Sequence, residues 1–255
     1  TAPQDCPYLD NQVERKLFTA LYGINSRRLN NSLSKQGFRR SQNVLYRPSC
    51  ANCSACMSAR ISSREFKPSK SQKRILLKNS DIVRVVNPAL ATDAQYDLFK
   101  QYITARHPNG GMSDMDANDF TAMIEETNVE SKLIEYYAKK NGELELISFS
   151  LVDILDDGIS MVYSVFNPDF KERSLGTYMI LDHNNLTLEM DLQYVYLGYW
   201  VQGSSKMDYK KRFSPLEVFT NDKWVCVSKS KITNINTYKL DQQKHGMPIY
   251  LPSED

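Results

Sequence analysis

The residues whose types and spacing point most directly to chemistry lie between Tyr194 and Phe219. The segment Tyr194–Val201 is rich in β-branched and aromatic residues and has the length of a buried strand. Gly203-Ser204-Ser205 ends this strand, and four cations follow within seven residues: Lys206, Lys210, Lys211 and Arg212. Cations and backbone donors at the end of a strand can hold phosphate. The alternative is a core strand followed by a charged loop in solvent.

A second basic region occupies the first third of the chain. Residues 1–80 contain 15 Lys/Arg and 4 Asp/Glu, whereas residues 81–255 contain 17 and 26, although the net charge of the whole chain is only +2. Residues 69–79 predict a helix on which Lys70, Lys73, Arg74 and Lys78 gather toward one face. Charge segregation this strong favours an anionic partner over an ordinary basic surface.

Three cysteines at a repeated spacing of three, Cys50, Cys53 and Cys56, raise the question of a zinc or iron–sulfur site. A closed site needs a fourth ligand, for which the sequence offers Cys6, because no histidine precedes His107. Since only three of the four ligands are local, we expect buried free thiols in a reducing compartment and no metal. The isolated Cys226 is expected in the core.

The composition is that of an ordinary globular protein, with 41% hydrophobic and 24% charged residues in 255. This length allows one large domain or two closely packed ones. No apolar run is long enough to cross a bilayer, and the first ten residues do not resemble a signal peptide. We therefore expect a cytoplasmic protein that does not contact a membrane.

The elements that must position these residues fall into two groups, separated at Asn87-Pro88, where the basic third ends. Before it we expect a strand or short helix at 13–21, a helix at 28–36, strands at 37–48 and 58–63, the basic helix at 69–79 and a strand at 81–86. After it, a helix over 92–106 leads to a loop that holds His107, and a second helix follows at 116–126. We place a basic N-terminal domain at 1–88 and a second domain at 89–255, whose tail from Lys229 is expected to be extended and loosely packed.

The part most informative about fold is residues 143–201. Glu143–Leu155 and Ile159–Phe166 read as two strands joined by the tight turn Asp156-Asp157-Gly158. An Arg-x-x-Gly turn, a helix over 179–190 and the strand 194–201 follow. This order resembles the centre of the acyltransferases that use acetyl-coenzyme A, in which amides at the helix N-terminus hold pyrophosphate. The final glycine of that turn pattern is replaced by Tyr178, so the pattern indicates the scaffold and only half supports coenzyme A.

Taken together, the sequence predicts an α+β fold, an acyltransferase-like (GNAT-type) mixed sheet flanked by helices, with a basic, cysteine-containing N-terminal portion packed against it. Eight further motifs occur in a characteristic order along the chain: Cys6–Leu9, Gly37–Ser41, Tyr46–Cys56, Ser71–Arg74, Arg106–Met112, Ser174–Thr177, Tyr196–Tyr199 and Lys206–Pro215. Through these motifs, most of the chain resembles one family, the aminoacyl-tRNA–protein transferases, and within it the short bacterial enzymes that transfer leucine.

The resemblance implies an enzyme that takes leucine from leucyl-tRNA and joins it to an N-terminal Asp or Glu of an acceptor protein, marking that protein for degradation. No cofactor is implied. The long eukaryotic relatives, which transfer arginine, have paired cysteines associated with metal, but Leu9 stands here where a second cysteine would follow the first Tyr. The alternatives are arginyl transfer, an acetyl-coenzyme A-dependent N-acetyltransferase, and a non-catalytic zinc-knuckle RNA-binding protein.

For this reaction, the acidic side chain of the acceptor calls for a bidentate cation, and Arg39 and Arg40 beside Ser41 are the first choice. Because neighbours on a strand face opposite ways, only one arginine can enter the pocket, and the other is free to face tRNA. His107 is the candidate base that collects the proton of the attacking amine. The residues expected at the tRNA are Lys206, Tyr209 and Lys210, with Tyr199 or Trp200 to stack on a base and Lys73 and Arg74 on the basic helix.

Overall fold

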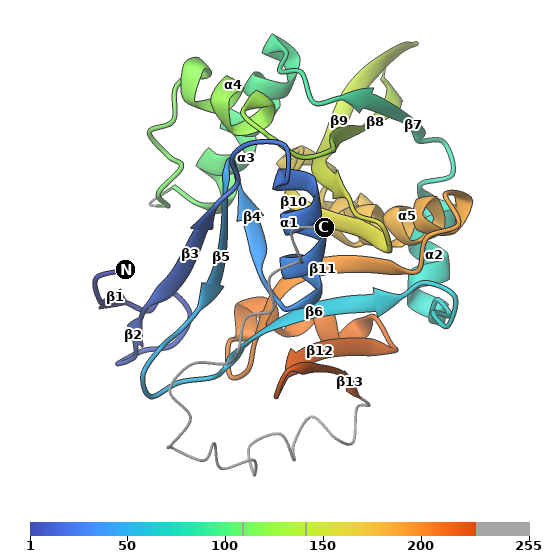
Figure 1. Ribbon diagram of the computed structural model, residues 1–255. Helices are drawn as coiled ribbons and strands as arrows, with labels where there is room; N and C mark the ends of the chain where they lie inside the picture. Colours follow the sequence, from blue (N-terminus) through green and yellow to red (C-terminus); the bar gives the residue numbers. More distant parts are fainter. Residues whose placement is uncertain (109, 141, 228–255) are drawn as a thin grey trace.

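The computed structural model describes residues 1–108, 110–140 and 142–227, so the expected loosely packed tail lies outside the described residues. Its centre is a sheet of eight strands in the order β13-β12-β6-β11-β10-β9-β8-β7 (Figure 1). The strands are β6 (Cys56–Ser62), β7 (Val83–Pro88), β8 (Ser131–Lys140), β9 (Glu143–Ile154), β10 (Gly158–Phe166), β11 (Tyr194–Val201), β12 (Leu216–Thr220) and β13 (Lys223–Val227). β10 and β11 are parallel and the other pairs are antiparallel. The predicted fold class, a mixed sheet flanked by helices, is confirmed.

Helices cover both faces of this sheet. α2 (Lys70–Lys78) and α5 (Leu175–Glu189) pack together on one face, where Ile134, Ile147 and Val152 meet α5. α3 (Asp93–Arg106) and α4 (Ala117–Glu125) cover the other face through Leu133, Phe149 and other side chains. Residues 133 and 134 are neighbours on one strand and therefore point to opposite faces, which is why the sheet separates two apolar cores. Within the described residues, no helix has the length and apolarity needed to cross a membrane.

The parallel pair β10–β11 opens into two unpaired edges part of the way along its length. The two strands pair at only three positions, from Gly158↔Tyr194 to Ser160↔Tyr196. Beyond them β10 has an irregularity between Met161 and Tyr163 on its β9 side, and β11 has one between Tyr196 and Gly198 on its β6 side. Bulges bend a strand and end its pairing, so the two strands diverge after Met161 and Leu197 and leave facing backbone groups without a ladder.

The N-terminal portion forms a smaller unit against the large sheet. β3 (Lys16–Ala20), β5 (Val44–Pro48) and β4 (Arg39–Ser41) make a three-stranded antiparallel sheet, and α1 (Ser26–Lys35) packs beside it. β1 (Gln4–Asp5) pairs with β2 (Val13–Glu14). β4 contacts β10, and Figure 1 shows α1 and β4 next to β10 and β11.

Three local expectations are corrected by the structure. The single strand expected over 37–48 is a hairpin, because Gln42 adopts a φ of 50° and the chain reverses between β4 and β5. α5 begins at Leu175 and not at 179, because Ser174, with a φ of 53°, directly precedes the helix and its carbonyl oxygen accepts from the amides of residues 177 and 178. Cys226, expected in the core, is exposed on the edge strand β13.

The large sheet also extends across the expected domain boundary at Pro88. β6 and β7, which precede that residue, are strands of the eight-stranded sheet, and β6 lies between β12 and β11. The hairpin of β9 and β10 and the order strand, strand, helix, strand are confirmed. The division into domains at 1–88 and 89–255 stays a prediction.

Candidate active site

A cleft of about 1170 Å³ lies where β10 and β11 diverge. Its walls come from β4, the C-terminal end of α3, the N-terminal end of α5 and η2, a 3-10 helix over Ser205–Arg212. Five of the residues singled out in the sequence line it: Arg39, Arg40, Ser41, His107 and Tyr209. Six do not: Tyr199, Trp200, Lys206, Lys210, Lys73 and Arg74. The five that line it come from three segments more than 60 residues apart in the chain, which the fold brings to one place.

Arg39 occupies the gap between the diverging strands. Its Nη2 donates to the carbonyl oxygen of Met161, which the strand pairing leaves free. The guanidinium lies against Gly198, whose φ of +80° and missing side chain leave the space that it fills. Nη1 of Arg39 is buried and has no hydrogen-bond partner. This nitrogen lies against Gly198. A buried donor on a charged group is costly to leave unpaired, so an anion held by this guanidinium would offset part of that cost.

Arg40 points to the opposite side of β4 from Arg39 and is paired with a carboxylate inside the protein. Its Nε and Nη2 donate to the two carboxylate oxygens of Asp153 at 2.7 and 2.6 Å, and both side chains are 1% exposed. Nη2 also donates to Ser131, which in turn donates to Asp153. The expected opposite orientation of the two arginines is therefore observed, but Arg40 already holds an internal carboxylate and does not face solvent. Ser41 is exposed at the rim of the cleft.

His107 lies at the C-terminal end of α3, where its backbone amide donates to the carbonyl of Ile103. Its ring packs edge-on against Tyr102, with centroids 5.7 Å apart. Partial burial, then the charges of Arg106 and Lys206, lower the pKa of His107 below its usual value. The imidazole is therefore largely neutral at pH 7, which is the form that can accept a proton.

Lys210 and Tyr209 are neighbours in η2 with different surroundings. Lys210 is 4% exposed, and its ammonium donates to the carbonyl oxygen of Tyr199 at 2.5 Å. Burial, followed by the charge of Arg39, lowers the pKa of Lys210 to about 7. Lys210 therefore lies beneath the cleft and does not reach its surface, whereas Tyr209 is 41% exposed and lines it.

The two aromatic residues expected to stack on a nucleotide base hold the fold together instead. Trp200 is fully buried in the core beneath α2 and η2, so no face of its indole is open to a ligand. The hydroxyl of Tyr199 shares its single proton between the carbonyl oxygens of Gly37 and Tyr46, at 3.0 and 2.9 Å, which ties β11 to the three-stranded sheet. The alternation of a strand hides this difference, because the sequence does not tell which face of β11 is covered.

The remaining expected cations lie on the surface beyond the cleft. Lys73 and Arg74 are exposed on α2, and Lys206 is exposed on η2. α2 and η2 are joined by a hydrogen bond of 3.0 Å from the Gln72 side chain to the carbonyl oxygen of Arg212. The basic helix and the basic turn thus form one continuous structural unit, although more than 120 residues separate them in the chain.

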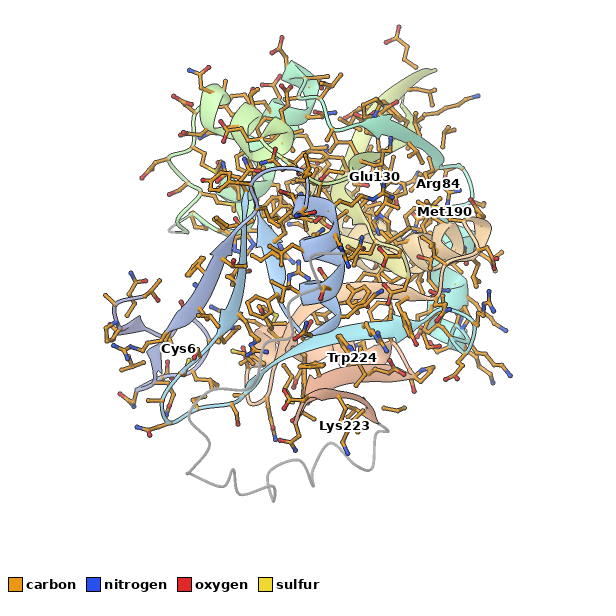
Figure 2. All side chains as sticks on the ribbon, viewed as in Figure 1. Cys6, Arg84, Glu130, Met190, Lys223 and Trp224 are labelled. Atoms are coloured by element: carbon orange, nitrogen blue, oxygen red, sulfur yellow. The ribbon has the colours of Figure 1, made fainter. Side chains whose placement is uncertain are left out.

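The four N-terminal cysteines, Cys6, Cys50, Cys53 and Cys56, lie near one another, as their mutual effects on ionisation indicate. Burial, then Cys53, Cys6 and Cys50, raise the pKa of Cys56 to about 12, so its thiol is protonated at neutral pH. Figure 2 labels Cys6 beside the N-terminal strands. Within the part of the chain that the structure describes, no set of three or more His, Cys, Asp or Glu has the geometry of a metal site. The absence of a metal stays a prediction.

The apolar residues of the cleft were not predicted from the sequence. Met161, Ile180, Leu197 and Met207 line it from β10, α5, β11 and η2. No local motif marks them, because each belongs to a different element. The N-terminal turn of α5, which also lines the cleft, was visible only through the Ser174–Thr177 motif.

Two solved structures show a distant likeness to this chain. FemX has a TM-score of 0.42 at 9% identity over 71% of this chain and 57% of that one. L-PGS from Bacillus licheniformis has a TM-score of 0.42 at 12% identity over 56% of this chain and 46% of that one.

Comparison with known sequences is far more specific. Residues 4–74 match the family described as Arginine-tRNA-protein transferase, N terminus, and residues 94–220 match its C terminus. A protein of Ruegeria pomeroyi named aspartate/glutamate leucyltransferase is 57% identical, with 89% of this chain and 83% of that protein aligned. One of the same name from Dinoroseobacter shibae is 52% identical over the whole of this chain and 94% of its own length. The chain therefore belongs to the arginine-tRNA-protein transferase family.

Proposed function

We propose that this chain is an aspartate/glutamate leucyltransferase, which moves leucine from leucyl-tRNA to the amino group of an N-terminal Asp or Glu. Support comes first from relatives of that name at 52–57% identity, aligned over more than four fifths of their length. The structural observation that carries the proposal is Arg39: a guanidinium in the wall of a large cleft, with one buried nitrogen unpaired. Such a group selects an acceptor that carries a carboxylate.

The chemistry needs positioning more than activation. The α-amine of the acceptor attacks the carbonyl carbon of the leucyl ester, the new C–N bond forms, and the C–O bond to the ribose breaks. The ribose oxygen leaves with a proton, and the amine loses one. Because the ester is already activated and a free α-amine has a pKa near 8, close approach in the correct orientation supplies much of the rate.

Arg39 would fix the acceptor by its carboxylate at the point where β10 and β11 diverge. An Asp or Glu held there has its α-amine within a few bonds of the anchored carboxylate, inside the same cleft. His107 lines the cleft and its pKa is lowered, and it would collect the proton of the amine. Arg40 would serve indirectly, because its pair with Asp153 fixes β4 and so the position of Arg39.

The tRNA would enter past η2 and lie over α2. Tyr209, exposed in the cleft, can stack on a terminal base, and Lys206 stands beside it on the surface. Lys73 and Arg74 extend this basic surface along α2 and would meet phosphates farther from the ester. Lys210, Tyr199 and Trp200 would support this surface from beneath.

The decisive experiment mixes the purified chain with leucyl-tRNA or arginyl-tRNA and peptides that begin with Asp, Glu, Lys or Ala. We expect leucine on the Asp and Glu peptides and none on the Ala peptide. Arginine in place of leucine would support the arginyl alternative, and conjugation of neither amino acid would refute the proposal. A matched assay with acetyl-coenzyme A tests the N-acetyltransferase alternative, for which we expect no product.

A further inference from the structure

The cleft has a polar rim and an apolar floor, and the reaction as proposed uses only the rim. Met161 and Leu197 mark the point at which the two strands diverge, and Ile180 faces them from α5. All three are more than 90% buried and belong to one cluster of touching side chains, against which Met207 of η2 packs. All four line the cleft. Four elements thus contribute one apolar residue each to a single floor.

This floor lies beside the residue proposed to hold the acceptor. The carbonyl oxygen of Met161 accepts a hydrogen bond from Arg39, and Leu197 directly precedes Gly198, on which the Arg39 guanidinium rests. An acceptor carboxylate at Arg39 therefore places the α-amine within several ångströms of the floor. Because the amine must reach the ester carbonyl, the side chain of the donor's amino acid must lie near that point too.

The charges of the cleft decide which side chain can lie there. The described residues that line it include the cations Arg39, Arg106 and Lys171 but a single carboxylate, that of the exposed Asp169. Arg40 is neutralised by its internal partner. A cationic side chain in this cleft would be repelled and would find no buried carboxylate, whereas an apolar one loses nothing.

From this convergence we infer that the apolar floor of Met161, Ile180, Leu197 and Met207 is the subsite for the donor's aminoacyl side chain. It selects a medium-sized apolar group over a cationic one. This inference rests on the proposed function and explains its preference for leucine over arginine. Two of the four residues are methionines, whose flexible thioethers adapt to shape, so the subsite should also accept an unbranched side chain such as that of methionine.

The test charges one tRNA body with leucine, methionine or arginine, so that only the aminoacyl group differs, and measures kcat/KM with an Asp peptide. For the unaltered chain we expect leucine and methionine within about tenfold of each other and arginine roughly 100-fold lower. In Met207→Glu, the new carboxylate should raise the ratio of arginyl to leucyl transfer by about tenfold or more. Met207→Leu should leave the ratio unchanged.

Met190→Glu is the matched control, because Met190 is exposed at the C-terminal end of α5 and lies outside the lining of the cleft (Figure 2). The inference is overturned if the unaltered chain transfers arginine with the same kcat/KM as leucine. This result does not depend on whether any variant folds. A folded Met207→Glu with an unchanged ratio overturns it too. In both cases leucine is still transferred, whereas transfer of none of the three amino acids would refute the proposed function itself.

Discussion

The guanidinium of Arg39 rests directly on Gly198, so that a Cβ atom added to this glycine would lie 2.5 Å from Arg39 Nη1. The contact joins β4 of the N-terminal unit to β11 of the large sheet. It also explains why β11 contains a glycine with a φ of +80° in a run that is otherwise aromatic and β-branched. The position of the acceptor-binding cation therefore depends on a backbone feature of another element.

Gly198→Ala should displace Arg39 and raise KM for Asp and Glu peptides by about tenfold or more, because a misplaced cation loses a charge-assisted hydrogen bond. The strained φ should also cost about 1–3 kcal/mol of unfolding free energy. Gly23→Ala is the matched control, since Gly23 has a φ of +76° but no atom within 4 Å of its added Cβ. It should lose similar stability with KM unchanged; an equal rise of KM in both variants would contradict the contact.

The two adjacent arginines should give opposite results. Arg39→Gln should raise KM for acidic peptides with little change in stability, because its side chain lies in the wall of the cleft. Arg40→Ala should instead cost about 3–5 kcal/mol of unfolding free energy, since it leaves the buried Asp153 carboxylate unpaired. Chemical denaturation and peptide kinetics on both variants separate the effects.

The control for this comparison is Arg27→Ala. Arg27 pairs with Glu130 on the surface, where its side chain is 65% exposed, and we expect a loss of less than about 1 kcal/mol. A stable Arg40→Ala with a raised KM would mean that Arg40, and not Arg39, binds the acceptor.

The pair Arg39 and Arg40 also marks how far the sequence could go. Strand alternation predicts that only one of the two arginines enters a pocket. It does not tell which one, because the carboxylate that holds Arg40 inside the protein belongs to Asp153, 113 residues away in the chain. The hairpin of β9 and β10 was predictable because its turn residues are adjacent in the chain. The burial of Trp200 and Lys210 was not predictable, because it depends on how α2 and η2 pack over β11. Local signals thus gave the elements, and long-range packing decided which side chains face the cleft.

Lys210 should make stability depend on pH. Its pKa is lowered to about 7 in the folded protein, whereas an unfolded lysine titrates near 10.4. Below about pH 7 both states hold the proton, so the cost of the buried charge is constant. Between about pH 7 and 10 the unfolded state binds a proton that the folded state has lost, and the unfolding free energy rises by up to roughly 1.4 kcal/mol per pH unit.

The measurement is the difference in unfolding free energy between the unaltered chain and Lys210→Met from pH 6 to pH 9.5. This variant loses the hydrogen bond to the Tyr199 carbonyl at every pH, so only the slope reports the titration. The difference should shift in favour of the unaltered chain as pH rises above 7. A flat difference would mean that the ammonium keeps its proton over this range.

His107 should set the acid limb of kcat, if it collects the proton of the attacking amine. Partial burial and the charges of Arg106 and Lys206 lower its pKa, so activity should fall only at a pH more acidic than that at which an ordinary histidine gains its proton. Lys206→Gln removes one of the two cations that lower this pKa, and the midpoint of the acid limb should move upward at saturating substrate. His107→Gln should reduce kcat by about 100-fold and abolish the limb. A limb that survives in His107→Gln belongs to another group.

The basic surface of α2 should act on tRNA and not on the peptide. Lys73→Gln combined with Arg74→Gln should raise KM for leucyl-tRNA and leave KM for the acceptor unchanged, because both side chains lie outside the cleft. For each phosphate contact that is lost, the slope of log KM against the logarithm of the salt concentration should decrease by about 0.7–0.9. Lys139→Gln with Lys223→Gln removes the same charge from exposed sites on β8 and β13 and serves as the control. Equal salt slopes in the two double variants would show that α2 contributes only general charge, since a contact surface must lose more affinity than a distant one.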